Sequence, residues 1–148
     1  AKNPELLKSV SQLINTIYSF STISEEIRSL VGLMASQASG CNYCIAHTSN
    51  SAIEKNISLE KVKNIWEFET SDSFSESEKA ALRIALNAAQ TPNLISDEHY
   101  SEFKKYYDEN QQIEILAIIS LFGFLNRWNS SLMTEIESLP STRMKEIE

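Results

Sequence analysis

The sequence predicts an all-α protein, and three observations support that prediction. Only three glycines and three prolines interrupt its 148 residues, which favours long helices over many short strands. Apolar residues recur at helical spacing through most of the chain. Residues typical of helix N-caps stand directly before these periodic stretches. We therefore expect about seven helices in one domain over residues 1–148, with a core over about 5–135 and a polar tail over 136–148.

Two helices are expected before the pair of cysteines. Pro4 follows an asparagine, an arrangement typical of the first turn of a helix, and apolar residues then repeat over 6–17. Ser24 precedes two glutamates and predicts the start of a second helix, because carboxylates are favourable in the first turn. This helix is expected to end at Gly40, since glycine readily adopts the positive φ that follows many helices.

Five further helices are expected from the cysteine pair onward. The first of them runs from near residue 41 to about 55. The N-caps predicted for the next four are Ser58, Ser75, Ser96 and Asp108, and Ser75 belongs to a capping-box pattern. The last helix, over about 109–135, is apolar around most of its circumference, so we expect its middle to be buried. Large aromatic residues expected in the core are Trp66, Phe122 and Phe124.

Composition and charge exclude several classes of protein. The net charge is −7 and no basic stretch is present, so nucleic acid is not an expected partner. No apolar run reaches the roughly 18 residues that span a bilayer, and no signal peptide is visible. Two cysteines three residues apart cannot provide the disulfide cross-links that stabilise small secreted proteins. We therefore expect a cytoplasmic protein with no membrane partner.

Cys41 and Cys44 form the main chemical signal of the sequence. Helix positions three apart share a face, so the two sulfur atoms can approach bonding distance. In a first turn, free backbone N–H groups and the helix dipole favour a thiolate. A thiolate that reduces a peroxide becomes a sulfenic acid, which a neighbouring thiol converts to a disulfide. His47 lies on the same face, three residues after Cys44, and is a candidate base.

Other interpretations of these residues stay open. The two cysteines could be buried structural residues. They could also bind zinc together with His47 and His99. A thioredoxin-like site is disfavoured because no strand–helix–strand pattern surrounds the motif, and Ile45 stands where covalent haem attachment needs a histidine. We expect neither a metal nor an organic cofactor.

The segment Ser39-Gly40-Cys41-Asn42-Tyr43-Cys44-Ile45-Ala46-His47-Thr48 resembles a motif of the carboxymuconolactone decarboxylase/alkylhydroperoxidase-D-like (AhpD-like) family. Segments 74–82 and 113–129 resemble later helices of that family, so the resemblance covers about residues 5–135. It implies an AhpD-like fold with the CxxC at the start of a core helix, self-association as a trimer or hexamer, and a peroxidase cycle. By position, Cys44 matches the peroxidatic cysteine, and Cys41 matches its proton donor and resolving partner in a disulfide.

Two positions depart from the peroxidases of this family. Thr48 stands where they carry the active histidine, and His47 lies one residue earlier. Ser29 stands where they carry a glutamate, and Glu26, one turn earlier on the same helix, is a candidate replacement as a relay. The candidate pocket residues are Tyr43, Asn126 and Arg127, and the guanidinium of Arg127 could bind a substrate carboxylate.

The sequence thus predicts a thiol-dependent hydroperoxide reductase or disulfide oxidoreductase of antioxidant defence. A small hydroperoxide would be its substrate, and a dithiol or lipoyl-type reductant would regenerate the cysteines. One alternative is a non-enzymatic redox sensor or scaffold oligomer with a reversible disulfide, which would show no turnover. Another is a decarboxylase-like acid–base enzyme for a small carboxylate, using His47 and Arg127. The resemblance disfavours the latter, because true decarboxylases of the superfamily lack the cysteine pair.

Overall fold

The computed structural model describes residues 2–147, with the side chains of residues 2–142 and 144. Every regular element in this part of the chain is a helix, which confirms the all-α prediction. None of the described helices is both long and apolar enough to cross a bilayer. The elements are α1 (Pro4–Tyr18), α2 (Glu25–Ala38), α3 (Asn42–Glu54), α4 (Leu59–Lys63), the 3-10 turn η1 (Ile65–Glu67), α5 (Glu76–Ala88), α6 (Asp97–Tyr106), α7 (Glu109–Leu132) and α8 (Ser138–Ile147).

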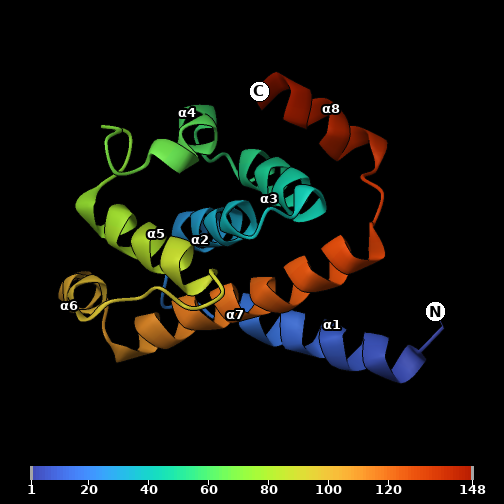
Figure 1. The fold of residues 1–148 in the computed structure, drawn as a ribbon, viewed down its shortest axis with the longest axis horizontal. Coiled ribbons are helices and arrows are strands. Elements are labelled where there is room, and N and C mark those ends of the chain that lie inside the picture. The colour runs from blue at the N-terminus through green and yellow to red at the C-terminus, as the bar shows by residue number, and fades with distance from the viewer. Residues whose placement is uncertain (1, 148) are drawn as a thin grey trace.

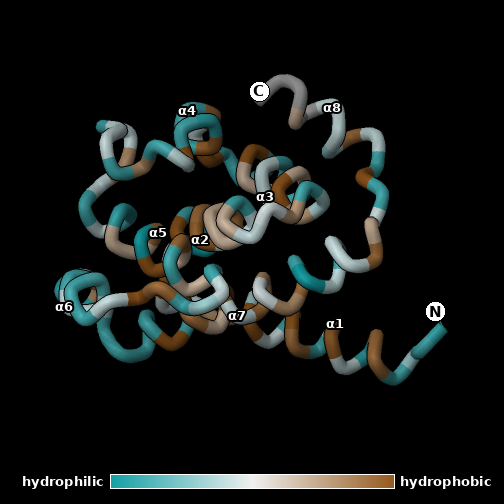
Figure 2. The backbone as a smooth tube through the Cα atoms, in the orientation of Figure 1, coloured by the Kyte–Doolittle hydropathy of each residue, from teal (hydrophilic) through white to brown (hydrophobic). Residues whose placement is uncertain are grey.

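Helix α2 lies at the centre of the molecule. It packs against α3, α5 and α7, which surround it in Figure 1. Its residues from Leu30 to Ser36 are all buried, so the helix contributes most of its circumference to the core. Figure 2 shows that apolar residues gather on this central helix and along α1 and α7. Helix α1 packs along α7, and α6 packs against α5. The cysteine motif therefore follows directly from the most deeply buried element.

Helices α2 and α7 approach closely where Gly32 has no side chain. A Cβ atom at Gly32 would lie 2.6 Å from Cε2 of Phe122 on α7. Phe122 is itself packed in the core, so a side chain at Gly32 would force its ring or the helices to shift. This close approach sets the distance between the two helices beside the cavity that both residues line.

We expect Gly32→Ala to lower the free energy of unfolding by about 1–3 kcal/mol, the usual cost of overpacking a core. Urea denaturation monitored by circular dichroism measures this change. Gly123→Ala is the matched control, because a Cβ at Gly123 of α7 meets no atom within 4 Å. The control should be neutral or stabilising, since alanine is the better helix former. Equal losses in the two variants would contradict the close-packing explanation.

The middle of α7 is largely buried, as expected, and only a narrow strip with Ile113, Ser120 and Phe124 is exposed between residues 113 and 125. Ile115, Ile118 and Leu121 face the core and are fully or almost fully buried. The side chain of Ile113 is 62% exposed, because it lies on the opposite face from this core-facing row. Phe122 is in the core as predicted. The two aromatic residues wrongly expected there are Phe124, 39% exposed, and Trp66, 58% exposed.

The segment expected to be a polar tail contains helix α8. Pro140 lies in the first turn of this helix, where the N–H that proline lacks has no partner within the helix. Helix α8 packs against α3, and Figure 1 places it on the side of α3 away from α1. The short connection between α7 and α8 is thereby held near the start of α3.

Candidate functional site

The two cysteines meet at the start of α3. Gly40 has a φ of +64°, a left-handed conformation that glycine adopts easily, and this turn places Cys41 at the N-cap of α3. The Cys44 backbone N–H donates a hydrogen bond to the Cys41 Sγ at 3.4 Å, so the sulfur caps the helix. The two Sγ atoms lie 2.8 Å apart, as the helical spacing predicts. Both residues are free thiols, within easy reach of a disulfide.

The Cys44 thiol is held in its protonated form. Burial, together with the hydrogen bond and charge of the neighbouring Cys41, raises the pKa of Cys44 to about 12. The Asn129 side-chain amide donates a hydrogen bond to the Cys44 Sγ at 3.7 Å and acts in the opposite direction. The N-terminus of a helix favours a thiolate, whereas burial favours the neutral thiol. Attack by Cys44 on a substrate therefore requires a base that removes its proton.

The two cysteines line different cavities. A cavity of about 470 Å³, which we name the Cys44 cavity, is lined by Cys44 but not by Cys41. A cavity of about 430 Å³, the Cys41 cavity, is lined by Cys41 but not by Cys44. Tyr43 and Asn129 line both cavities and so lie between them. The aromatic residues of the Cys44 cavity are Tyr18, Tyr43, Phe122 and Trp128, which suit a substrate with a flat or apolar body.

One wall of the Cys44 cavity carries a net positive charge. Arg28 pairs with Glu25 at 2.6 Å, and Lys55 pairs with the same carboxylate, so two cations share one anion. The Arg28 Nε and the Ser29 Oγ are buried without a hydrogen-bond partner among the described residues. This wall can therefore favour a substrate that carries a negative or hydrogen-bonding group.

His47 lies in the Cys44 cavity and is held by an acidic residue from the far end of the chain. Its Nε2 is 2.7 Å from Oε2 of Glu137, which lies between α7 and α8. The ring of His47 also packs against the Tyr43 ring, with 4.3 Å between centroids. The sequence does not point to Glu137, because 90 residues separate it from His47 and no local pattern marks it.

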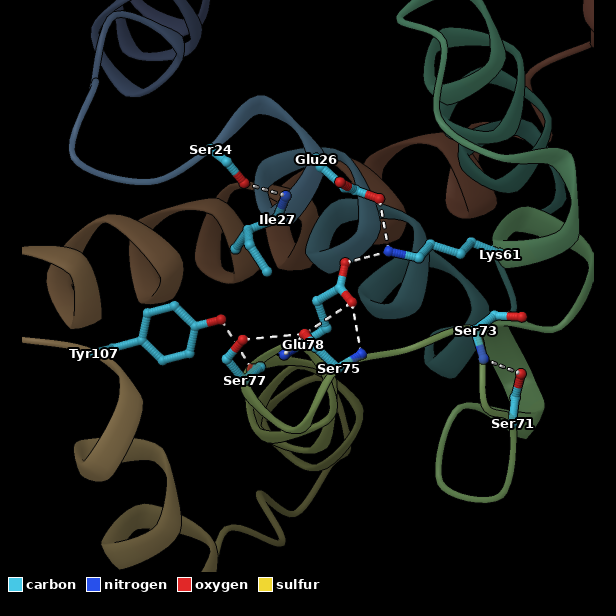
Figure 3. A network of polar contacts seen from close by, with 10 residues as sticks. All are labelled: Ser24, Glu26, Ile27, Lys61, Ser71, Ser73, Ser75, Ser77, Glu78 and Tyr107. Atoms are coloured by element: carbon cyan, nitrogen blue, oxygen red, sulfur yellow. Dashed lines mark hydrogen bonds and ion pairs between the residues drawn. The ribbon is translucent and has the colours of Figure 1, made fainter.

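Glu26 belongs to an ion-pair network away from the cysteines. Its carboxylate accepts a hydrogen bond from the Lys61 Nζ at 2.8 Å, and Lys61 also pairs with Glu78 at 2.6 Å (Figure 3). The network joins α2, α4 and α5. The structure therefore assigns Glu26 to helix packing rather than to a relay that serves the cysteines.

Two candidate pocket residues on α7 also lie outside the Cys44 cavity. Asn126 donates a hydrogen bond to the Ala35 carbonyl at 3.2 Å and joins α7 to α2. Arg127 donates to the Thr91 hydroxyl at 3.3 Å and lines other cavities. The polar residue of α7 that reaches Cys44 is Asn129, nearly one turn beyond Asn126. Of the predicted pocket residues, only Tyr43 lines the Cys44 cavity.

The described residues do not support the zinc alternative. Within residues 2–142 and 144, no group of three or more His, Cys, Asp or Glu side chains is arranged to hold a metal ion. His99, the fourth ligand required, caps the start of α6, where its Nδ1 accepts a hydrogen bond from the Ser96 N–H at 3.2 Å.

Sequence comparison finds relatives of this chain. The profile of the Carboxymuconolactone decarboxylase family matches residues 4–87. The uncharacterized protein YdfG of Bacillus subtilis (strain 168) is 28% identical over 110 residues, which are 74% of this chain and 73% of YdfG.

Solved structures share the same arrangement of helices. The apo structure of the debrominase Bmp8 has a TM-score of 0.94 at 39% identity, covering 99% of this chain and 79% of that chain. Bmp8 has also been solved as a cysteine-to-alanine variant in complex with 2,3,4-tribromopyrrole. ATU0492 of Agrobacterium tumefaciens, a protein of unknown function compared to the antioxidant defence protein AhpD, has a TM-score of 0.87 at 19% identity. The match to ATU0492 covers 93% of this chain and 94% of ATU0492, and shows a common fold.

Proposed function

Because this chain belongs to the carboxymuconolactone decarboxylase family and has the AhpD-like fold, we propose that it is a dithiol reductase for small organic hydroperoxides. The observation that carries the proposal is the 2.8 Å separation of the Cys41 and Cys44 sulfurs beside a cavity. Two thiols this close can deliver two electrons and store the oxidised state as a disulfide. Cys44 lines the larger cavity and is therefore the sulfur that meets the substrate.

The reaction has two steps. In the first, the Cys44 sulfur attacks the terminal oxygen of the hydroperoxide, the O–O bond breaks, and the alkoxide leaves as an alcohol after taking a proton. Cys44 is then a sulfenic acid. In the second, the Cys41 sulfur attacks the Cys44 sulfur, and water leaves as the disulfide forms. One hydroperoxide and two thiols thus give one alcohol, one water and one disulfide.

His47 is the proposed base of the first step. The pKa of Cys44 is raised to about 12, so the thiol must lose its proton as it attacks. His47 lines the same cavity, and an imidazole accepts a proton near neutral pH. The proton removed from Cys44 can then pass to the departing alkoxide. Asn129 supports the developing thiolate with its hydrogen bond to the Cys44 sulfur.

Reductive removal of bromine from an aromatic ring is a second candidate function. It is favoured by the aromatic walls of the Cys44 cavity and by 39% identity to the debrominase Bmp8 over 99% of this chain. In this reaction the Cys44 sulfur takes the bromine atom without its bonding electrons, and a proton replaces bromine on the carbon. Cys41 then displaces bromide and closes the disulfide. One aryl bromide and two thiols give one arene, one hydrogen bromide and one disulfide.

A pair of single-turnover assays tests the proposed function. Reduced protein, freed of excess dithiothreitol, is mixed with one equivalent of cumene hydroperoxide or, separately, of 2,3,4-tribromopyrrole. We expect cumyl alcohol and a loss of two hydrogens from the protein, with repeated turnover once dithiothreitol is restored. Bromide release without alcohol would replace the first function by the second. A disulfide without turnover would indicate a redox sensor, and neither product nor disulfide in either arm would overturn both functions.

The physiological reductant and the subunit number stay predictions from sequence. A dithiol or lipoyl-type reductant would restore both thiols by exchange with the disulfide. Self-association as a trimer or hexamer is compatible with an exposed apolar strip on α1 and α7. Its members are Leu6, Leu7, Leu13, Phe124 and Trp128.

A further inference from the structure

The carboxylate of Glu137 contacts the candidate base His47. Glu137 Oε2 lies 2.7 Å from Nε2 of His47, and its Oε1 accepts a hydrogen bond from the Tyr43 hydroxyl at 3.4 Å. Both partners lie on α3, whereas Glu137 comes from the segment between α7 and α8. The two oxygens of one carboxylate therefore bind two neighbouring rings of α3 that pack against each other.

We propose that Glu137 is the positioning carboxylate of His47, a role that rests on the proposed function of the cysteine pair. A carboxylate is only an acceptor, so Nε2 carries the proton and donates it to Glu137. Nδ1 is then the unprotonated nitrogen that can receive the Cys44 proton. The resulting imidazolium is stabilised by the negative charge 2.7 Å from Nε2.

The ionisation of Glu137 agrees with this role. A hydrogen bond from its own backbone N–H and the hydrogen bond from His47 lower the pKa of Glu137 below its ordinary value. The carboxyl group is therefore charged at neutral pH. Glu26, the residue otherwise available as a relay, is bound to Lys61, and no carboxylate stands at Ser29.

The rate at which iodoacetamide alkylates Cys44 tests the proposal without any substrate. Mass spectrometry of the peptide that contains the motif separates alkylation at Cys44 from that at Cys41. We expect Glu137→Gln, which keeps a hydrogen-bond acceptor but loses the charge, to slow Cys44 alkylation at neutral pH about 10-fold, part of the usual contribution of a general base. Glu137→Asp should restore part of the rate. Glu135→Gln is the matched control in the same exposed segment and should react like the wild type.

A double-mutant cycle separates this role from a merely structural one. In a His47→Gln background, Glu137→Gln should cause no further slowing of alkylation, because Glu137 acts only through His47 and that side chain is already lost. Full slowing in that background, or a wild-type rate in Glu137→Gln, would overturn the proposal. Thermal unfolding of each variant checks that the fold is intact. If Glu137→Gln slows alkylation while the wild type reduces no hydroperoxide, the proposed function fails and the pairing of Glu137 with His47 stands.

Discussion

Replacing Cys44 by serine is expected to lower hydroperoxide turnover by at least about 10³-fold, the scale of loss when a nucleophile is removed. A serine hydroxyl is far less nucleophilic than a thiol and cannot form a disulfide with Cys41. The variant should fold normally, because serine is close to cysteine in size. Steady-state loss of cumene hydroperoxide in the presence of dithiothreitol measures the effect.

Cys41→Ser should behave differently and serves as the comparison. Its Cys44 remains in the cavity, so one equivalent of hydroperoxide should still be reduced, and the sulfenic acid should accumulate. Dimedone, which traps sulfenic acids, should label Cys44 in this variant and label neither cysteine in the wild type. Equal turnover in Cys44→Ser and wild type would remove Cys44 from the mechanism. Activity that survives loss of both cysteines would point to acid–base chemistry instead.

Replacing Lys61 by methionine is expected to destabilise the fold by about 2–3 kcal/mol. Lys61 pairs with Glu78 at 2.6 Å, and the side chain of Glu78 is only 11% exposed, so the change leaves a nearly buried carboxylate without its cation (Figure 3). Breaking a fully buried pair costs about 3–5 kcal/mol, and the remaining exposure lowers this figure. Urea denaturation measures the loss. Lys63→Met, an exposed lysine on the same helix, is the control and should change stability by less than about 0.5 kcal/mol.

The loss of stability caused by Lys61→Met should depend on pH. Desolvation raises the pKa of Glu78, but hydrogen bonds from Lys61 and Ser75 outweigh it and leave this pKa below its ordinary value. A carboxyl group whose pKa is lowered by folding stabilises the fold above its unfolded pKa, about 4.3 for glutamate, and loses this contribution as pH falls through the folded pKa. The difference between wild type and Lys61→Met should therefore be largest near pH 7 and shrink below pH 4. A difference that is constant over this range would show that the charge of Glu78 is not involved.

Much of the helical pattern could be predicted because caps and apolar spacing are local features. Ser24, Ser75, Ser96 and Asp108 each accept a backbone hydrogen bond at the start of the helix they were expected to begin. The cysteine pair could be predicted for the same reason, since the N-cap and the first turn of one helix fix the relation of the two sulfurs. Helix α8 could not, because its polar sequence gave no apolar stripe and its position depends on contact with α3.

The surroundings of the cysteines depend on long-range contacts that no local pattern encodes. Asn129 reaches Cys44 across 85 residues, and Glu137 reaches His47 across 90. Helical spacing predicts Glu26 as a relay for the cysteines, whereas its carboxylate pairs with Lys61, 35 residues away. The sequence therefore predicts where the two sulfur atoms lie, and tertiary packing decides which groups surround them.

Because Cys41 and Cys44 line different cavities, binding of an inhibitor in one cavity could be detected by labelling from the other. A compound that fills the Cys44 cavity would exclude substrate but leave the route to Cys41 clear. A fluorescent maleimide small enough for the Cys41 cavity would then still label the occupied protein, and its attachment would be confined to one cysteine. Inhibitor binding and labelling could thus be measured on the same molecule, which would not be possible if both cysteines lined a single cavity.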